Sequence, residues 1–308
     1  MFRECLPGRQ LSAWIFAAVT PVAIQLTAGT SWLWTGIVSV VCALAVRLVW
    51  TKGAVTLPKW FAVLSFIVVA LTAGELVSAA GYSWPTGNRM AVPMILLALA
   101  AWSAQKGPSA AARVGCVLFW AVVAIYFIVL AAGAKEVQMQ WLRPVGSALD
   151  WDLVIVSLAP AAACVLLEKE RRWSPRLMLP GAFILCASII TAGVLSPAVA
   201  SKLGDAFYEM SRSLSVLGVA KRFEAVVSAG MTLGWFALLN LYFTVCGKYF
   251  ERICCGWGRI GVFMGAAIAG VWLLCNLHIP KEALAIMAAV FGVVLPLLAQ
   301  GIERIKKS

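Results

Sequence analysis

FYEMSRSLSVLGVAKRFEAVVSAGMTLGWFALLNLYFTVCG, residues 207–247, joins a short charged segment to a long apolar one. An α-helix needs about 20 apolar residues to cross a bilayer, and the second half of this stretch supplies them. Runs of similar length recur along the 308 residues, of which 62% are hydrophobic and only 12% charged. Short alternating segments typical of membrane β-strands are not found. The sequence therefore predicts an all-α, polytopic membrane protein.

Apolar runs bounded by charge, glycine or proline predict about ten transmembrane helices in a single domain, residues 1–308. The first is short for a full span, and Pro21 is expected to kink it. Most of the 25 Lys and Arg residues fall in alternate loops, which predicts a multi-pass cell-membrane protein with cytoplasmic N- and C-termini. The predicted spans lie near residues 11–27, 31–49, 58–80, 90–104, 114–133, 151–168, 177–198, 222–246, 259–277 and 283–301.

Several function classes are disfavoured by the composition. The net charge is +12, but the basic residues lie at the ends of apolar runs and form no continuous face, so no nucleic-acid partner is expected. The chain has one histidine, and its nine cysteines show no metal-ligand spacing. No nucleophile and base pair stands out. We therefore predict neither an enzyme nor a cofactor or metal site.

The charged segment of the opening stretch has the pattern of a short amphipathic helix on the outer surface. Asp205 is placed to cap it, and Glu209 can pair with Arg212 at a spacing of three residues. Phe207, Met210 and Leu214 repeat at helical spacing and predict one apolar face.

The apolar segment that follows carries a polar stripe. At 100° per residue, one sector of this predicted helix holds Lys221, Glu224, Ser228, Thr232 and Trp235. Such a stripe is consistent with a ligand or ion path, and equally with snorkelling side chains and interhelical hydrogen bonds. Glu75, late in the third predicted span, either faces a polar cavity or reaches the interface.

The quoted stretch resembles the region of spore germination receptor B subunits in which an Arg-x-Glu opens a span that contains a tryptophan. Arg222, Glu224 and Trp235 occupy those positions. Residues 83–145 resemble the same family's Trp-Pro, Lys-Gly, Ala-Arg and Leu-x-Pro elements. The matching residues there are Trp84, Pro85, Lys106, Gly107, Ala112, Arg113, Leu142 and Pro144.

The resemblance implies a member of the amino acid/polyamine/organocation transporter superfamily, with a LeuT-like inverted-repeat core and a shortened first span. In such folds the first and sixth spans are broken, and their exposed backbone binds the solute. The family's Gly-x-Gly before Pro21 and its Glu in the sixth span are absent here. The ligand-binding residues are expected to be Pro21, Ala23, Gln25, Thr27, Ser157 and Pro160. The structural or gating residues are expected to be Glu75, Arg222, Glu224, Ser228 and Trp235.

The function implied by the resemblance is that of a germination receptor B-type subunit in the spore inner membrane, sensing a small nutrient such as an amino acid. Its implied partners are an A-type membrane subunit and a C-type lipoprotein subunit, besides the nutrient and the lipid bilayer. Two alternatives stay open: an amino acid/cation secondary transporter, and a ligand-less membrane scaffold of the same fold.

Overall fold

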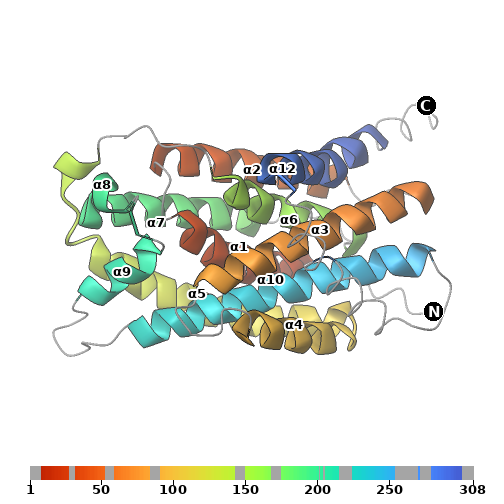
Figure 1. The fold of residues 1–308 in the computed structure, drawn as a ribbon, viewed down its shortest axis with the longest axis horizontal. Helices are drawn as coiled ribbons and strands as arrows, with labels where there is room; N and C mark the ends of the chain where they lie inside the picture. Colours follow the sequence, from red (N-terminus) through yellow and green to blue (C-terminus); the bar gives the residue numbers. More distant parts are fainter. Residues whose placement is uncertain are drawn as a thin grey trace.

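A computed structural model describes residues 8–27, 32–52, 59–83, 91–142, 150–167, 175–200, 202–203, 205–214, 224–253, 270 and 279–299. Every regular element in these ranges is a helix, which confirms the all-α prediction (Figure 1). The α-helices are α1 (Gly8–Leu26), α2 (Trp32–Lys52), α3 (Lys59–Ser83), α4 (Ala91–Ala104), α5 (Pro108–Gly133), α6 (Trp151–Leu167), α7 (Leu179–Leu195), α8 (Pro197–Ala200), α9 (Ala206–Ser213), α10 (Glu224–Ile253) and α12 (Lys281–Ala289). Short turns are η2 (Met139–Trp141), η3 (Pro175–Met178) and the π-helical η4 (Val290–Val294).

Five described segments are long and apolar enough to cross a membrane: Trp32–Val49, Lys59–Ala79, Pro108–Gly133, Glu224–Glu251 and Lys281–Ala299. Three shorter apolar helices accompany them: Ala91–Ala104, Trp151–Cys164 and Leu179–Leu195. The predicted span 259–277 lies outside the described residues except for residue 270. The described part of the chain is thus helical, with several segments suited to cross a membrane, and the number ten stays a prediction.

Several predicted boundaries, among them those of α5, α7 and α10, differ from the observed helices by two residues or more. α5 begins at Pro108 and not near residue 114, because Gly107 has a positive φ of 93° and a proline is favoured in the first turn. α7 ends at Leu195 and not at 198, since Ser196 has a φ of 63° that breaks the helix before α8. α10 continues to Ile253, seven residues past the predicted end at 246.

α1 is the most enclosed helix of the bundle. Every residue from Leu11 to Gln25 is buried, and the helix packs against α5, α6, α7 and α10. The surrounding helices instead expose large apolar side chains, among them Trp34 on α2, Trp60 on α3 and Trp120 on α5. Exposed apolar residues of this size, on helices long enough to span a bilayer, form a surface suited to lipid. The short first helix therefore lies inside the bundle, away from this surface.

The two helices expected to be broken are continuous in the structure. α1 runs through Pro21 and α6 runs through Pro160 without interruption. A proline removes one hydrogen bond and crowds the preceding turn, but neighbouring helices can enclose the altered backbone. Here Gly234 of α10 gives that room, because a Cβ at this position would lie 2.4 Å from the Cβ of Pro21. No described unwound backbone is left in either helix for a solute.

Candidate functional site

A partly buried charge cluster joins three helices of the bundle. The Lys281 ammonium at the start of α12 forms an ion pair with Asp152 of α6, and lies 3.6 Å from Oε1 of Glu75 on α3. The Lys281 side chain is 49% exposed, whereas those of Asp152 and Glu75 are only 8% and 14% exposed. We call Glu75, Asp152 and Lys281 the charged junction. Its cation is thus reachable from outside while its anions are enclosed.

The helix ends at the junction favour its negative charges and disfavour its positive charge. Asp150 precedes α6 and its Oδ1 accepts a hydrogen bond from the backbone N–H of Asp152 at 2.9 Å, as a helix-capping side chain does. Asp152 lies in the first turn of α6, where the helix dipole favours a negative charge. The same dipole disfavours Lys281 at the first residue of α12. Lys281 therefore depends on its carboxylate partners.

The described residues around the junction carry more negative than positive charge. Asp150, Asp152 and Glu75 surround the one ammonium of Lys281. Burial, and then the charge of the neighbouring Asp152, raise the pKa of Asp150. Asp152 is 6% exposed, and its Oδ1 is buried without a hydrogen-bond partner among the described residues. The junction thus has a buried acceptor oxygen with no donor among the described residues.

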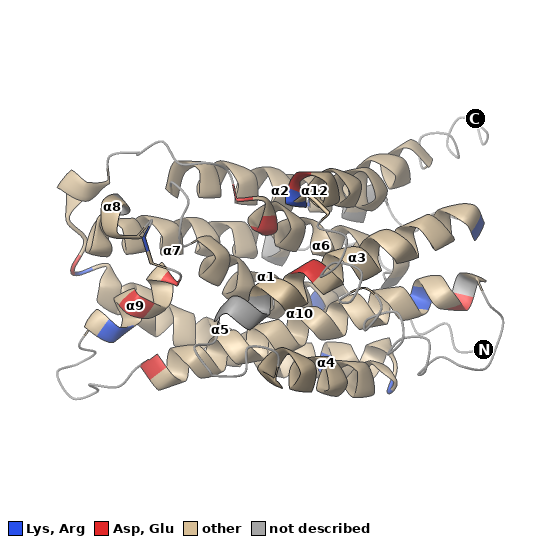
Figure 2. Ribbon diagram, viewed as in Figure 1, with Lys and Arg blue, Asp and Glu red and all other residues tan. Residues whose placement is uncertain are grey.

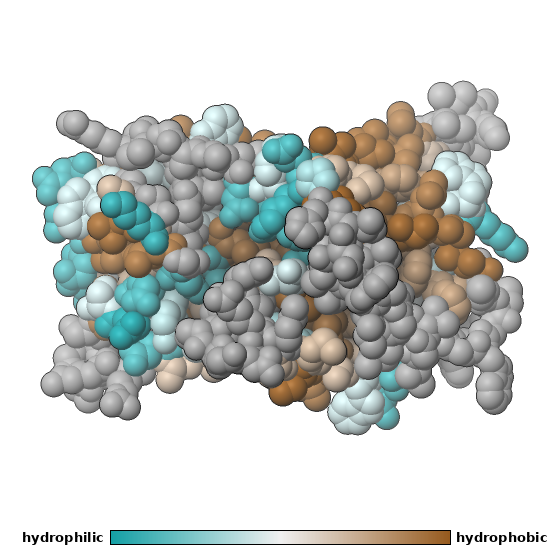
Figure 3. All heavy atoms as spheres, in the orientation of Figure 1, coloured by the Kyte–Doolittle hydropathy of each residue, from teal (hydrophilic) through white to brown (hydrophobic). Residues whose placement is uncertain are grey.

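The junction lies between the two ends of the bundle. Figure 2 shows charged ribbon segments on α3, α6 and the start of α12, well away from the end at which α8 and α9 lie. On the face seen in Figure 3, a polar patch lies over the start of α12, with apolar atoms beside it. Ionisable groups enclosed among apolar helices are costly unless they are paired.

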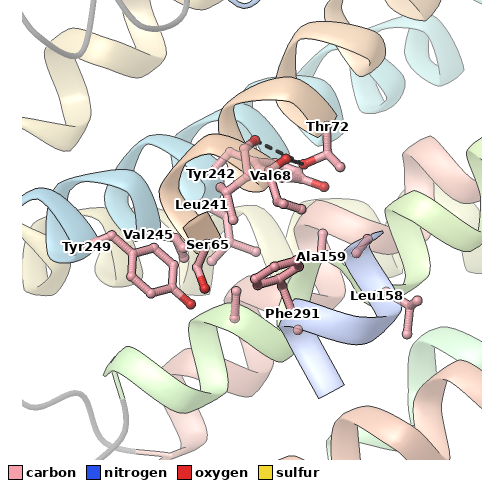
Figure 4. A pocket seen from close by; sticks show the side chains of 14 residues that line it. Ser65, Val68, Thr72, Leu158, Ala159, Leu241, Tyr242, Val245, Tyr249 and Phe291 are labelled. Carbon is pink, nitrogen blue, oxygen red and sulfur yellow. Dashed lines mark hydrogen bonds between the residues drawn. The ribbon is translucent and has the colours of Figure 1, made fainter. Parts of the chain in front are cut away.

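A small cavity of about 30 Å³ lies beside the junction, between α3, α6, α10 and η4 (Figure 4). Its walls combine apolar side chains with hydroxyl groups. Thr72 and Tyr242 share a hydrogen bond, and the Ser65 hydroxyl is buried without a partner among the described residues. The π-helical turn places Phe291 and Gly292 in the wall, and such turns occur frequently at functional sites.

The same helix faces form the junction and the cavity. Glu75 follows the cavity residue Thr72 by one turn of α3. On α6 and α12, Asp152 and Lys281 each precede a cavity residue by two turns, or about 10 Å along the axis; these residues are Ala159 and Ala288. The cavity therefore lies one to two helical turns along the bundle from the junction residues, none of which lines it.

The predicted ligand-binding residues are not gathered at one place. Ser157 and Pro160 line a second cavity of about 20 Å³ between α1, α2, α6 and α7, where the Ser157 hydroxyl has no partner among the described residues. Pro21 and Ala23 are buried on α1. Thr27 follows α1, and its hydroxyl donates to the backbone carbonyl of Ile24 at 2.7 Å. None of the residues from α1 lines the cavity beside the charged junction.

Gln25, another predicted ligand residue, instead meets Trp235, a predicted gating residue. The Trp235 Nε1–H donates to Oε1 of Gln25 at 2.7 Å, and both side chains are buried. Gln25 also hydrogen-bonds the carboxylate of Asp205, which accepts the backbone N–H of Tyr208 at 2.9 Å. Burial raises the pKa of Asp205 to about 6. A buried polar chain therefore links α1, α9 and α10.

The short amphipathic helix is confirmed as α9. Asp205 caps it as predicted, and Phe207, Met210 and Leu214 are buried. Its apolar face packs against α7 and α10, and Phe207 stacks on Tyr126 of α5 with ring centroids 5.4 Å apart. Glu209 and Arg212 form the predicted pair at 3.2 Å on the exposed side. α9 thus covers one end of the bundle.

The polar stripe of α10 runs from a partly exposed Glu224 at its first residue to Trp235 in the core. Between them Ser228 and Thr232 are partly exposed, and the Thr232 hydroxyl donates to the Ser228 carbonyl at 2.9 Å. Arg222, also predicted as a gating residue, and Lys221 lie outside the described residues. Glu75, which sequence analysis left open, pairs with Lys281 inside the bundle.

Sequence analysis missed Asp152 and Lys281. Both stand at the start of an apolar run, the position at which loop charges that set topology are expected. The available signal was the helix dipole, because a lysine in a first turn is unfavourable without a partner. In the described part of the chain, no group of three or more His, Cys, Asp or Glu side chains is arranged to hold a metal ion.

A scan against protein-family models finds no match to this chain, and a search of curated proteins finds no significant match.

Proposed function

We propose that the protein is a membrane-embedded subunit that binds a small polar solute at the charged junction. The observation that carries the proposal is a net-negative ion cluster enclosed among α3, α6 and α12 beside a cavity. Well-packed apolar residues often stabilise a protein as much as a buried ion pair does, so structure alone gives little reason for this cluster. A solute that binds there can supply the missing positive charge.

On this proposal the protein acts as a nutrient sensor of the germination receptor B type, in the spore inner membrane. The resemblance of residues 83–145 and 207–247 to that family supports this setting, with A-type and C-type subunits as partners. Solute binding shifts the population between two conformations, by as much as the solute prefers one over the other. The small volume of the cavity in this structure is consistent with a closed conformation.

The test is ligand-induced stabilisation of the purified protein in nanodiscs. We expect members of a panel of amino acids and small amines to raise the melting temperature of the wild type. A ligand at 100 times its Kd stabilises by about 2.7 kcal/mol, which is a shift of several degrees. Asp152→Asn should abolish the shift, whereas Glu251→Gln, which alters the distant ion pair with Lys248, should keep it. If no compound shifts the wild type, the ligand-less scaffold is favoured.

A second candidate is a secondary transporter that moves such a solute together with a cation. The observation that favours it is the excess of carboxylates over lysine at the junction, since a free carboxylate can carry a proton or cation. Uptake of labelled solute into proteoliposomes separates the two functions. A transporter accumulates solute when an ion gradient is imposed, whereas a sensor binds it with little turnover.

A further inference from the structure

We propose that Lys281 is a built-in occupant of an ammonium site, and that the solute of this site is a small primary amine whose ammonium group displaces it. This inference rests on the proposed solute-binding function of the charged junction and names the chemical class of its ligand. The exchange breaks and forms only ion pairs and hydrogen bonds. The Lys281 ammonium moves to water as the ammonium of the solute enters.

The acceptors of the junction exceed what Lys281 uses. A primary ammonium has three N–H donors. Lys281 contacts one oxygen of Asp152, and its 3.6 Å distance from Glu75 is longer than an ordinary hydrogen bond. The second carboxylate oxygen of Asp152 is buried and has no donor among the described residues. A free amine, unlike a tethered one, can orient its three donors toward both carboxylates.

The position and exposure of each charged side chain determine which of them can move out of the junction. Asp152, in the first turn of α6, and Glu75, within α3, are nearly enclosed. Lys281 stands at the first residue of α12, with a half-exposed, four-carbon side chain. Rotation of that side chain takes its ammonium into solvent without movement of a helix. The solvent-accessible position of Lys281 is therefore also the entrance for a solute.

The cavity beside the junction restricts the body of the solute. It lies along the same faces of α3, α6 and α12, and its volume of about 30 Å³ holds one or two water-sized groups. Its walls offer the unpartnered Ser65 hydroxyl among apolar neighbours such as Val68, Leu158 and Phe291. A solute reaches these walls only if its carbon chain extends one to two helical turns from its ammonium, and an anionic solute is repelled by the excess of carboxylates.

Chemical rescue tests the inference without knowledge of the natural solute. Lys281→Ala removes the occupant and leaves two carboxylates unpaired, so its melting temperature should fall by about 5 °C. Ethylammonium chloride should restore most of that loss. Tetramethylammonium chloride, which has the same charge but no N–H donor, and sodium chloride at equal ionic strength should not. Lys248→Ala, which alters the ion pair with Glu251, serves as the matched control and should gain nothing from ethylammonium.

If Lys281→Ala does not give a melting transition, the same salts are added during extraction, and the monodisperse fraction of the protein is measured. Ethylammonium should raise that fraction, and the double variant Lys281→Ala with Asp152→Asn should lose the effect. Equal recovery in all three salts, or no recovery, overturns the inference. Rescue does not depend on a nutrient response. If ethylammonium rescues Lys281→Ala but no nutrient shifts the melting temperature of the wild type, the ammonium site is kept and the nutrient-sensing function is rejected. If solutes without an amine shift the wild type and ethylammonium does not rescue the variant, the solute-binding function is kept and the ammonium site is rejected.

Discussion

The contact between α1 and α10 and the charged junction both bury polar groups, but in opposite ways. At the α1–α10 contact two indole groups have neutral acceptors: Trp235 donates to Gln25, and the Trp14 Nε1–H donates to the Ala237 carbonyl at 3.2 Å. At the junction the groups are charged, an acceptor is unused, and a cavity lies alongside. Fully paired buried groups rigidify a core, whereas an unpaired one calls for an explanation such as an absent ligand. This difference is the reason that we propose a structural role for the first region and solute binding for the second.

The largest effect is expected at the closest approach of α1 and α10. Gly234→Ala places a Cβ 2.4 Å from the rigid ring of Pro21, so unfolding free energy should fall by about 2–3 kcal/mol. Thermal melts of the purified protein measure this. Gly230→Ala is the matched control on the same helix, because its nearest neighbours would lie at 3.4 Å, an ordinary contact. Equal losses of unfolding free energy in the two variants would show that the close approach of α1 and α10 at Gly234 does not limit stability.

Trp235→Phe tests the paired hydrogen bonds of the same contact. It leaves the Gln25 carbonyl oxygen buried without its donor, and we expect a loss of about 1–3 kcal/mol in unfolding free energy. Trp120→Phe, at a side chain that is 69% exposed, should cost far less. Solute-induced shifts in melting temperature should persist in both variants. Loss of those shifts in Trp235→Phe alone would make this contact part of the binding site.

Glu75→Gln tests the charged junction from its more weakly paired side. The contact with a half-exposed Lys281 is 3.6 Å long, so the stability of the variant should change by less than about 1 kcal/mol. Loss of one anionic acceptor should nevertheless weaken solute binding about tenfold, equivalent to about 1.4 kcal/mol. Titration calorimetry in nanodiscs measures the Kd. A large stability loss with unchanged Kd would make the junction structural.

The stability contributed by Asp205, the cap of α9, is expected to depend on pH. Burial raises the pKa of Asp205 from 3.8 to about 6, so the folded state binds this proton more tightly than the unfolded chain does. Stability from this group therefore increases as the pH falls through about 6, and the gain is complete below about 3.8. Between pH 7.5 and pH 5 we expect a gain on the order of 1 kcal/mol. The melting temperature of the wild type should therefore rise relative to that of Asp205→Asn as the pH falls from 7.5 to 5, and a difference between the two that does not change with pH would contradict the assignment.

The smallest effect is expected for the exposed pair of α9. Arg212→Ala removes an ion pair with Glu209 whose members are 54% and 38% exposed. Solvent screens such pairs, so the stability change should stay below about 0.5 kcal/mol. Melts at low and high salt should coincide for this variant and the wild type. A larger loss would mean that the charged face of α9, and not only its apolar face, holds it on the bundle.

Local patterns allowed much of the fold to be predicted. Hydrophobic runs located most of the observed helices, and the cap residue Asp205 with the apolar spacing after it identified α9 (Ala206–Ser213). Boundaries were less accurate where one residue decided them, as at Gly107 and Ser196, because a positive φ is a property of the folded backbone. The expectation of broken helices at Pro21 and Pro160 was wrong, because packing around a proline decides whether the helix continues through it.

The sequence by itself determined the class of the protein, the places of its helices and the amphipathic character of α9, because each depends on residues a few positions apart. Only the tertiary structure decided which polar groups meet. Lys281 and Asp152 are 129 residues apart in the chain, and Trp235 and Gln25 are 210 apart. The physical reason is that periodicity defines a helix face but not the helix that packs on it. The neutral link within the α1–α10 contact and the charged junction were therefore visible only once the bundle was assembled.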